Sequence, residues 1–203
     1  MEGSARCIVF RLKQQLNRID FIETQIVELE AEIERQNKPF EEAVTRLAEI
    51  PGFDRVTAWS VIAEIGINMD QFPSAQHLAS WAGVCPGNNE SAGKRLSGKT
   101  RKGSRWLRQK LCQSAWSSSR AKKSYFAAFF QRIAAKRGRK RAIVAVSHAL
   151  LVTCYYLLKR KCPFQDLGVQ YFDQLNHEKL TGYFVKRLTR LGHTVKLEPA
   201  RAS

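Results

Sequence analysis

A glycine-rich and basic segment over residues 84–104 (VCPGNNESAGKRLSGKTRKGS) holds the residues whose types and spacing can do chemistry. Ser91 lies in the run ESAGKR, and Gly93, Lys94 and Arg95 follow it closely. A seryl hydroxyl can attack a phosphodiester while cations stabilise charge on the phosphate oxygens and glycine permits close backbone approach. Positive side chains can supply that stabilisation without a metal ion. The same spacing fits a turn-forming serine, so spacing alone leaves both interpretations open.

The positive charge of the chain is concentrated in its second part. The 203 residues include 34 Lys and Arg against 18 Asp and Glu, a formal net charge of +16. Residues 1–50 have 7 basic and 10 acidic side chains (net −3), which leaves 27 basic and 8 acidic (net +19) for residues 51–203. No Asp or Glu lies between Glu90 and Asp166, whereas residues 91–165 hold 20 Lys and Arg. Such a block neutralises phosphates and releases counterions, so it predicts nucleic acid as a partner; the alternative is a solvated basic surface.

Several functional classes are disfavoured by the composition. A metal-dependent nuclease site needs clustered carboxylates, and residues 91–165 cannot supply them. The five cysteines are far apart and, like the four histidines, lack ligand spacing, which predicts reduced thiols, no metal site and a cytoplasmic protein. Residues 142–158 form an apolar run at the short limit for a membrane span. Ser147, His148 and Thr153 interrupt this run, which favours a buried core helix.

Apolar residues recur along residues 11–47 at the spacing of a coiled coil. They follow one another at steps of 4, 3, 3, 4, 3 and 4: Leu12, Leu16, Ile19, Ile22, Ile26, Leu29 and Ile33. Glutamates lie between them, so the acidic face argues against contact with DNA. The pattern predicts a long assembly helix that forms a coiled coil, or a helical hairpin with the segment around Phe40, Val44 and Leu47.

Residues 50–66 (IPGFDRVTAWSVIAEIG) predict a Pro-Gly turn followed by a helix that ends at Gly66. This pattern is typical of half of a helix-hairpin-helix element, in which backbone N–H groups approach phosphate. A plain packing unit is the alternative. Further helices are predicted over residues 73–83, 105–119, 124–136, 142–158 and 176–191. Strand signals are few, so the predicted fold class is mainly α.

The predicted helix over residues 105–119 (RWLRQKLCQSAWSSS) is amphipathic and basic. Its spacing predicts an inner side formed by Trp106, Leu107, Leu111, Ala115 and either Trp116 or Ser118.

Taken in order, three segments resemble the C-terminal transposase domain of bridge-RNA-guided insertion-sequence transposases of the IS-one-ten type. They are IPGFDRVTAWSVIAEIG, LASWAGVCPG with Phe72 before it, and ESAGKRLSGKTRKGSRWLRQKL. The resemblance covers about residues 44 to 199, and the preceding helix is similar to that family's coiled-coil connector. It implies residues 1–49 as assembly helices and residues 50–203 as a compact helical DNA-binding and strand-transfer domain.

The resemblance implies a serine nucleophile that becomes linked to a DNA phosphate, and the matching serine is Ser91, with Ser97 a weaker competitor. Candidate phosphate contacts are Lys94, Arg95, Lys99, Arg101, Lys102, Arg105 and Arg108. The implied partners are DNA, a structured guide RNA, and further copies of the chain through residues 11–47. No metal or cofactor is expected in this chain.

One departure from the family pattern affects the expected activity. Relatives have an N-terminal ribonuclease-H-like domain with four metal-binding acidic residues, and the acidic residues of 1–50 cannot be assigned to it. Cleavage by this polypeptide alone is therefore in doubt, and a non-catalytic nucleic-acid-binding remnant or regulator is the alternative. A structural helix-hairpin-helix protein of repair type is a third possibility, in which the ESAGKR loop has no role.

Overall fold

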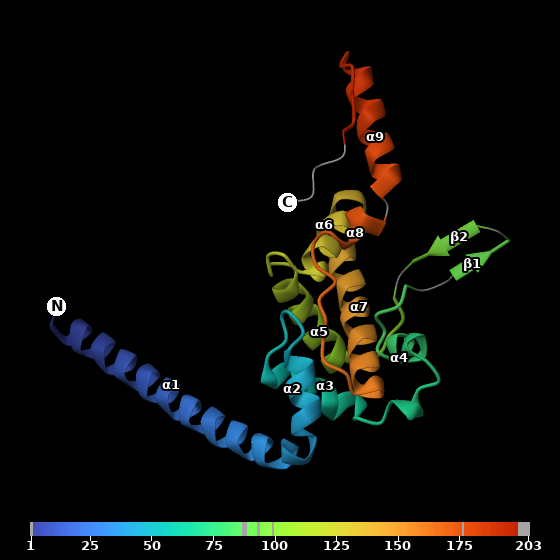
Figure 1. Ribbon diagram of the computed structural model, residues 1–203. Helices are drawn as coiled ribbons and strands as arrows, with labels where there is room; N and C mark the ends of the chain where they lie inside the picture. The colour runs from blue at the N-terminus through green and yellow to red at the C-terminus, as the bar shows by residue number, and fades with distance from the viewer. Residues whose placement is uncertain (1, 87–88, 93, 99, 176, 199–203) are drawn as a thin grey trace. The chain divides into compact units, whose positions relative to one another are not determined.

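The computed structural model describes residues 2–86, 89–92, 94–98, 100–175 and 177–198. The elements in chain order are α1 (Glu2–Asn37), η1 (Lys38–Phe40), α2 (Glu41–Ala48), α3 (Arg55–Ile65), η2 (Met69–Gln71), α4 (Ala75–Trp81), β1 (Asn89–Ser91), β2 (Lys94–Ser97), α5 (Arg105–Ser118), α6 (Tyr125–Arg137), α7 (Arg139–Arg160), α8 (Tyr171–Leu175) and α9 (His177–Arg190) (Figure 1). The predicted mainly α fold is confirmed. Contacts divide the chain into two compact units, unit 1 (Met1–Glu42) and unit 2 (Ala43–Ser203).

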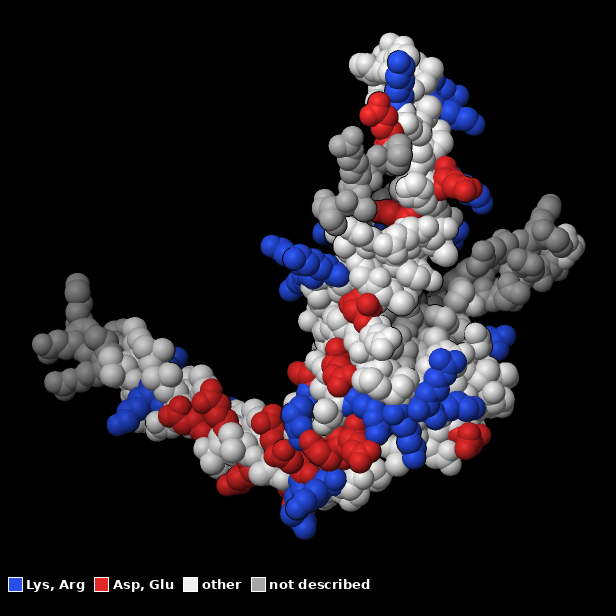
Figure 2. Space-filling view, in the orientation of Figure 1, with Lys and Arg blue, Asp and Glu red and all other residues white. Residues whose placement is uncertain are grey.

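Unit 1 is dominated by the long helix α1, whose apolar stripe faces solvent. The seven stripe residues, from Leu12 to Ile33, are 40 to 63% exposed. Figure 2 shows acidic side chains along this helix, and Glu32 forms an ion pair of 2.7 Å with Arg35. The predicted helical hairpin between α1 and the segment around Val44 and Leu47 is wrong. Both residues are fully buried in the core of unit 2 instead of covering the stripe.

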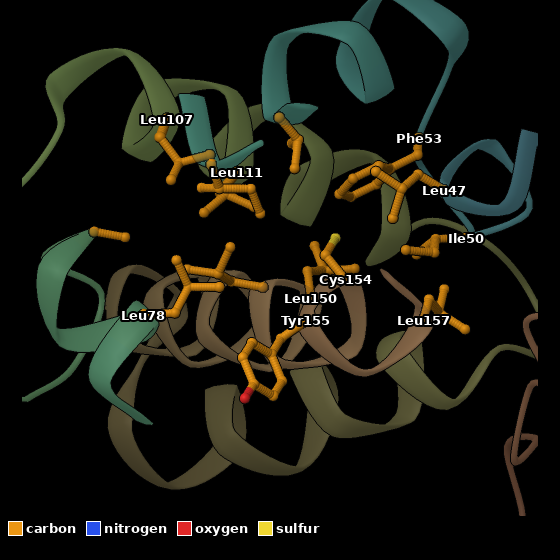
Figure 3. Close-up of a cluster of buried hydrophobic side chains, with 14 of the residues drawn as sticks. Leu47, Ile50, Phe53, Leu78, Leu107, Leu111, Leu150, Cys154, Tyr155 and Leu157 are labelled. Atoms are coloured by element: carbon orange, nitrogen blue, oxygen red, sulfur yellow. The ribbon is translucent and has the colours of Figure 1, made fainter. Parts of the chain in front are cut away.

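Helix α7 is the central element of unit 2, and it contacts η2, α4, α5 and α6. In Figure 3, Leu150 and Cys154 of α7 face Leu107 and Leu111 of α5 across the core. The polar Ser147 is fully buried, and its hydroxyl donates to the carbonyl oxygen of Ile143 at 2.9 Å. A buried hydroxyl with such a partner avoids the cost of an unmade hydrogen bond. The interruption of the apolar run by Ser147 is thus accommodated inside a protein core.

By length and composition, α7 also satisfies the criterion for a membrane-spanning helix, and it does so alone among the described residues. Within its apolar window, 56% of the residues are buried inside the protein. This burial against α4, α5 and α6 is what the sequence predicts for a core helix.

The turn at Pro51 and Gly52 packs closely against the end of α5. Gly52 has a φ of +87°, and a Cβ at this position would meet the Ser118 side chain and the carbonyl oxygen of Ser114. The Ser118 hydroxyl also donates to the carbonyl oxygen of Pro51. Glycine is therefore required here both for its backbone angle and for the close approach of two segments. Phosphate contact by this turn, as in a helix-hairpin-helix element, stays a prediction.

Most of the predicted helix ends agree with the structure, because each has a local capping signal. Helix α3 begins after Asp54, whose side chain accepts from the backbone N–H of Thr57, and ends at Gly66. Helices α4, α5 and α6 begin after Ser74, Ser104 and Ser124, each of which caps its helix through the side chain. Serine and aspartate are favoured at this position because they satisfy otherwise unpaired N–H groups.

The inner face of α5 differs from the prediction at Trp106 and Ser114. Leu107, Leu111 and Ala115 are buried as expected, and Ser118 is buried rather than Trp116. Ser114, which the pattern did not include, is buried as well. The prediction for Trp106 is wrong, because its side chain is 70% exposed. Trp106 comes directly before the buried Leu107 in the sequence. The predicted inner face was drawn too wide on this side of the helix, and it therefore included the indole by mistake.

Candidate nucleic-acid interface

The segment that contains Ser91 forms a short antiparallel hairpin. Strands β1 and β2 pair Ser91 with Lys94 and Glu90 with Arg95, and the register is irregular after Asn89. Ala92, between the strands, has a φ of +49°, which fits a tight two-residue connection. The backbone therefore brings a serine and a lysine opposite each other at the end of the hairpin. The side chains of Ser91, Lys94 and Arg95 lie outside the described part of the structure.

The two ends of the hairpin segment are held together by the close approach of two glycines. Gly83 ends the turn after α4 with a φ of +71°, and a Cβ there would meet backbone atoms of Arg101 and Gly103 at 2.8 Å. A Cβ on Gly103 would overlap the backbone of residues 81–83. Only residues without side chains allow this backbone contact. The contact fixes the points at which the hairpin segment leaves and rejoins the helices.

Immediately after Gly103, Ser104 fixes the start of α5. Its hydroxyl oxygen accepts from the backbone N–H of Leu107 at 3.2 Å, and its hydroxyl donates to Glu64 Oε2 of α3 at 2.8 Å. A single side chain thus caps α5 and ties it to α3. The first turn of α5, which contains Arg105 and Arg108, is positioned by both contacts.

An open pocket of about 480 Å³ lies along the beginning of α5. Its lining residues are Lys102, Gly103, Arg105, Arg108, Gln109 and Cys112. Three of these six are cations, and the pocket borders the N-terminus of a helix, where backbone N–H groups favour anions. Among the described residues, the lining includes no carboxylate that would offset these charges. The arrangement suits the binding of phosphate groups.

The structure brings together three of the seven predicted phosphate contacts. Lys102, Arg105 and Arg108 line this pocket, and Arg101 is exposed nearby in sequence without lining it. Lys94 and Arg95 are placed only by their backbone pairing, and Lys99 lies outside the described residues. These assignments as DNA contacts stay predictions. Ser97, the competitor of Ser91, pairs with Asn89 at the other end of the hairpin.

Sequence reasoning missed the residues that hold this region in place. Gly83, Gly103 and Glu64 act through contacts between segments that are distant in sequence, and no local pattern predicts those contacts. A signal did exist for Ser104, since serine just before an amphipathic run is a typical helix cap. Among the described residues, no group of three or more His, Cys, Asp or Glu could hold a metal ion.

Two nearby groups have shifted pKa values. Burial raises the pKa of the Cys85 thiol, which lies just before the hairpin. The hydrogen bond from Thr57 lowers the pKa of Asp54, the cap of α3. Neither shift produces a reactive group, because the first disfavours the thiolate and the second stabilises a structural carboxylate.

Comparison with known proteins finds a family model and curated relatives that match part of this chain. Residues 44–131 match the model of the Transposase IS116/IS110/IS902 family. The matched segment runs from α2 into α6 and includes the hairpin and the basic pocket. The chain is also similar to the pilin gene-inverting proteins of Moraxella bovis and Moraxella lacunata, at 31% identity over 121 residues in each case. The alignment covers 58% of this chain and 37% of the length of each relative.

Proposed function

We propose that this chain binds DNA through unit 2 and takes part in transposition or inversion of a DNA segment, with Ser91 as the nucleophile. The observation that carries the proposal is the pairing of Ser91 with Lys94 in a hairpin whose base, at Gly103, borders a pocket with three cations. The family match over residues 44–131 and the names of the two relatives support the same class of reaction.

In the proposed step, Ser91 Oγ forms a bond to the phosphorus of a DNA phosphodiester, and the bond from that phosphorus to one deoxyribose oxygen breaks. The seryl proton passes to solvent, and the released oxygen takes up a proton from solvent. The ester bond to the serine preserves the phosphoester, so a hydroxyl of another strand can displace the serine and complete strand exchange. Lys102, Arg105 and Arg108 would stabilise the charge on the phosphate oxygens.

Two further partners belong to the proposal. A structured guide RNA is suggested by the resemblance to bridge-RNA-guided transposases, and the excess of positive charge in residues 91–165 suits a second polyanion. Other copies of the chain would assemble through the stripe of α1, whose leucines and isoleucines lie in solvent. Strand exchange requires at least two DNA ends to be held together, and an assembly helix supplies a means to do so.

The proposal is tested by trapping the covalent intermediate. The chain would be mixed with DNA ends of its own element and the guide RNA, with a ribonuclease-H-like domain supplied in trans, and denatured before electrophoresis. We expect a labelled protein–DNA adduct that disappears in Ser91→Ala. The matched control is Ser97→Ala, in the same hairpin, which should retain the adduct.

The alternative is a nucleic-acid-binding protein without catalysis. It predicts binding that weakens steeply with salt, as the first proposal does, but no adduct under any condition. An adduct of undiminished yield in Ser91→Ala would remove Ser91 from the role. Loss of the adduct in Ser97→Ala alone would transfer the role to the competing serine.

A further inference from the structure

Trp106 differs from the other tryptophans of the chain in its surroundings. Trp59 is buried, Trp81 packs against Phe72 with ring centroids 5.9 Å apart, and Trp116 packs against Phe130 at 6.0 Å. Trp106 is 70% exposed, and the described residues supply no aromatic or cationic partner for its ring. Exposing an indole forfeits the free energy gained by burying a large aromatic side chain. Packing within the described chain therefore does not explain this residue.

The charges beside Trp106 indicate what could cover it. Trp106 follows Arg105, which lines the basic pocket with Lys102 and Arg108. Gln109, another lining residue, is three positions further along α5, so its side chain neighbours that of Trp106 on the helix surface. The exposed indole thus lies beside a site suited to phosphate and close to a neutral amide. An acidic peptide would satisfy the cations, but it would not need a bare aromatic face next to them.

We propose that Trp106 stacks on an unpaired nucleobase, while Lys102, Arg105 and Arg108 bind the phosphates on either side of that nucleotide. Aromatic side chains beside cationic grooves bind single-stranded segments in this way, because every base has a face available for stacking. In a paired duplex the base faces are covered by their neighbours, so Trp106 favours nucleic acid that is locally unpaired. This inference rests on the proposed function and adds to it a preference for distorted or single-stranded substrate.

The test measures binding of the full chain to four labelled probes by fluorescence anisotropy. The probes are a blunt DNA duplex, the same duplex with a short unpaired bulge, a DNA single strand, and an RNA single strand of the same sequence. We expect Trp106→Ala to weaken binding to the bulged and single-stranded probes by about tenfold, and to the blunt duplex by less than about twofold. The DNA and RNA strands distinguish the two sources of an unpaired base.

Two further variants separate stacking from other roles of Trp106. Trp106→Phe keeps an aromatic ring and should restore most of the preference for unpaired probes. Trp116→Ala, on the same helix, removes a tryptophan that already has Phe130 as a partner, and it should leave that preference unchanged. Quenching of tryptophan fluorescence by the single strands should be smaller in Trp106→Phe than in the native chain and in Trp116→Ala, because the stacked indole is absent.

Distinct results would overturn this inference or the function beneath it. Equal weakening of all four probes in Trp106→Ala, or no weakening, rejects stacking at Trp106 while leaving DNA binding intact. A change in oligomeric state of Trp106→Ala in light scattering also rejects it, because a second copy would then cover the indole. If the native chain binds none of the probes in a salt-dependent manner, the proposed function fails together with the inference.

Discussion

The two compact units place their apolar side chains in opposite environments. In unit 1 the leucines and isoleucines of the α1 stripe are 40 to 63% exposed, whereas Leu47, Leu78, Leu107 and Leu111 of unit 2 are at most 1% exposed. Burial of apolar surface is the main favourable term in folding, so unit 2 has its own source of stability. The long helix α1 lacks such a core, and isolated helices gain little from propensity alone. This exposed stripe is the surface that the proposed assembly through α1 would cover.

The two regions of the chain also differ in net charge. Residues 1–50 have a net charge of −3 and residues 51–203 a net charge of +19. A polyanion is attracted to the second region and not to the first. Under the proposed function, unit 1 would assemble the chain and unit 2 would bind nucleic acid, so substitutions in the two units should affect different measurements.

The largest expected effect is on the stability of unit 2. Leu111 is fully buried against α7, so Leu111→Ala should lower the free energy of unfolding by about 2–5 kcal/mol through lost burial and a residual cavity. Leu16→Ala in α1 removes a side chain that is 59% exposed and should leave the unfolding of unit 2 unchanged. Urea unfolding followed by circular dichroism measures both. Equal effects would show that unit 2 does not hold its core alone.

The second prediction concerns assembly. Ile22 and Ile26 lie one turn apart on the stripe of α1, and replacing both with Glu would place charges where copies of the helix are proposed to meet. We expect the double variant to be monomeric in light scattering at concentrations at which the native chain associates. Its thermal unfolding in unit 2 should not change. A native chain that is monomeric at high micromolar concentration would contradict this assembly role.

Next in size is the backbone contact at the base of the hairpin. Gly103→Ala would introduce a Cβ that overlaps the backbone of residues 81–83, and relief of that overlap should cost about 1–3 kcal/mol. The displaced base should also weaken DNA binding. The matched control is Gly182→Ala in α9, where the added Cβ would meet nothing within 4 Å beyond its chain neighbours and its own helix backbone. Unfolding midpoints that are equal for the two variants would show that the contact contributes nothing.

Much of this fold was predictable because its signals are local. Helices begin after Asp54 and Ser74, whose side chains cap them, and a helix ends at Gly66, which has no side chain. Each of these signals can be read from a single residue. The packing partner of the α1 stripe was less predictable. A spacing of three and four residues does not say whether the helix that covers the stripe belongs to the same chain. The structure excludes the intrachain hairpin because Val44 and Leu47 are buried elsewhere.

The candidate site was predictable only in part, for a related reason. Ser91 and the cations are visible in the sequence, because a run without carboxylates requires no knowledge of tertiary structure. The approach of Gly83 to Gly103 and the bond from Ser104 to Glu64 depend on how α3, α4 and α5 pack together. Tertiary packing also decided the exposure of Trp106, one residue away from the buried face.

A smaller effect is expected from single cations. Arg105→Ala removes one lining cation of the pocket and should weaken DNA binding uniformly across sequences, with the slope of log affinity against log salt reduced by about 1. Arg11→Ala, an exposed arginine of α1, should change neither quantity. Titrations at several salt concentrations provide both numbers. An equal loss in the two variants would assign DNA binding to overall charge instead of to unit 2.

The smallest predicted effect is on stability, and it is tested with one carboxylate from each unit. Asp54 caps α3 by accepting from the backbone N–H of Thr57 at 2.7 Å, and hydrogen bonding first to the Thr57 side chain and then to its backbone lowers the pKa of Asp54. Asp54→Ala should therefore destabilise unit 2 by about 1 kcal/mol at neutral pH. In unit 1, the bond from Arg35 lowers the pKa of Glu32 in the same direction, but this pair is in solvent. Glu32→Gln should leave the unfolding midpoint unchanged, because water already solvates both charges.

The pH dependence separates the charge of Asp54 from its shape. Because the pKa of Asp54 is lower in the folded chain, its stabilisation is fully present above the unfolded value of about 3.9 and is lost as pH falls below it. The stability difference between the native chain and Asp54→Ala should therefore shrink in acid. Asp54→Asn retains an oxygen that accepts from Thr57. Because an amide does not titrate in this range, the contribution of this cap to stability should not change with pH. A difference between native chain and Asp54→Ala that stays constant down to pH values below both pKa values would show that the carboxylate charge contributes nothing to the cap.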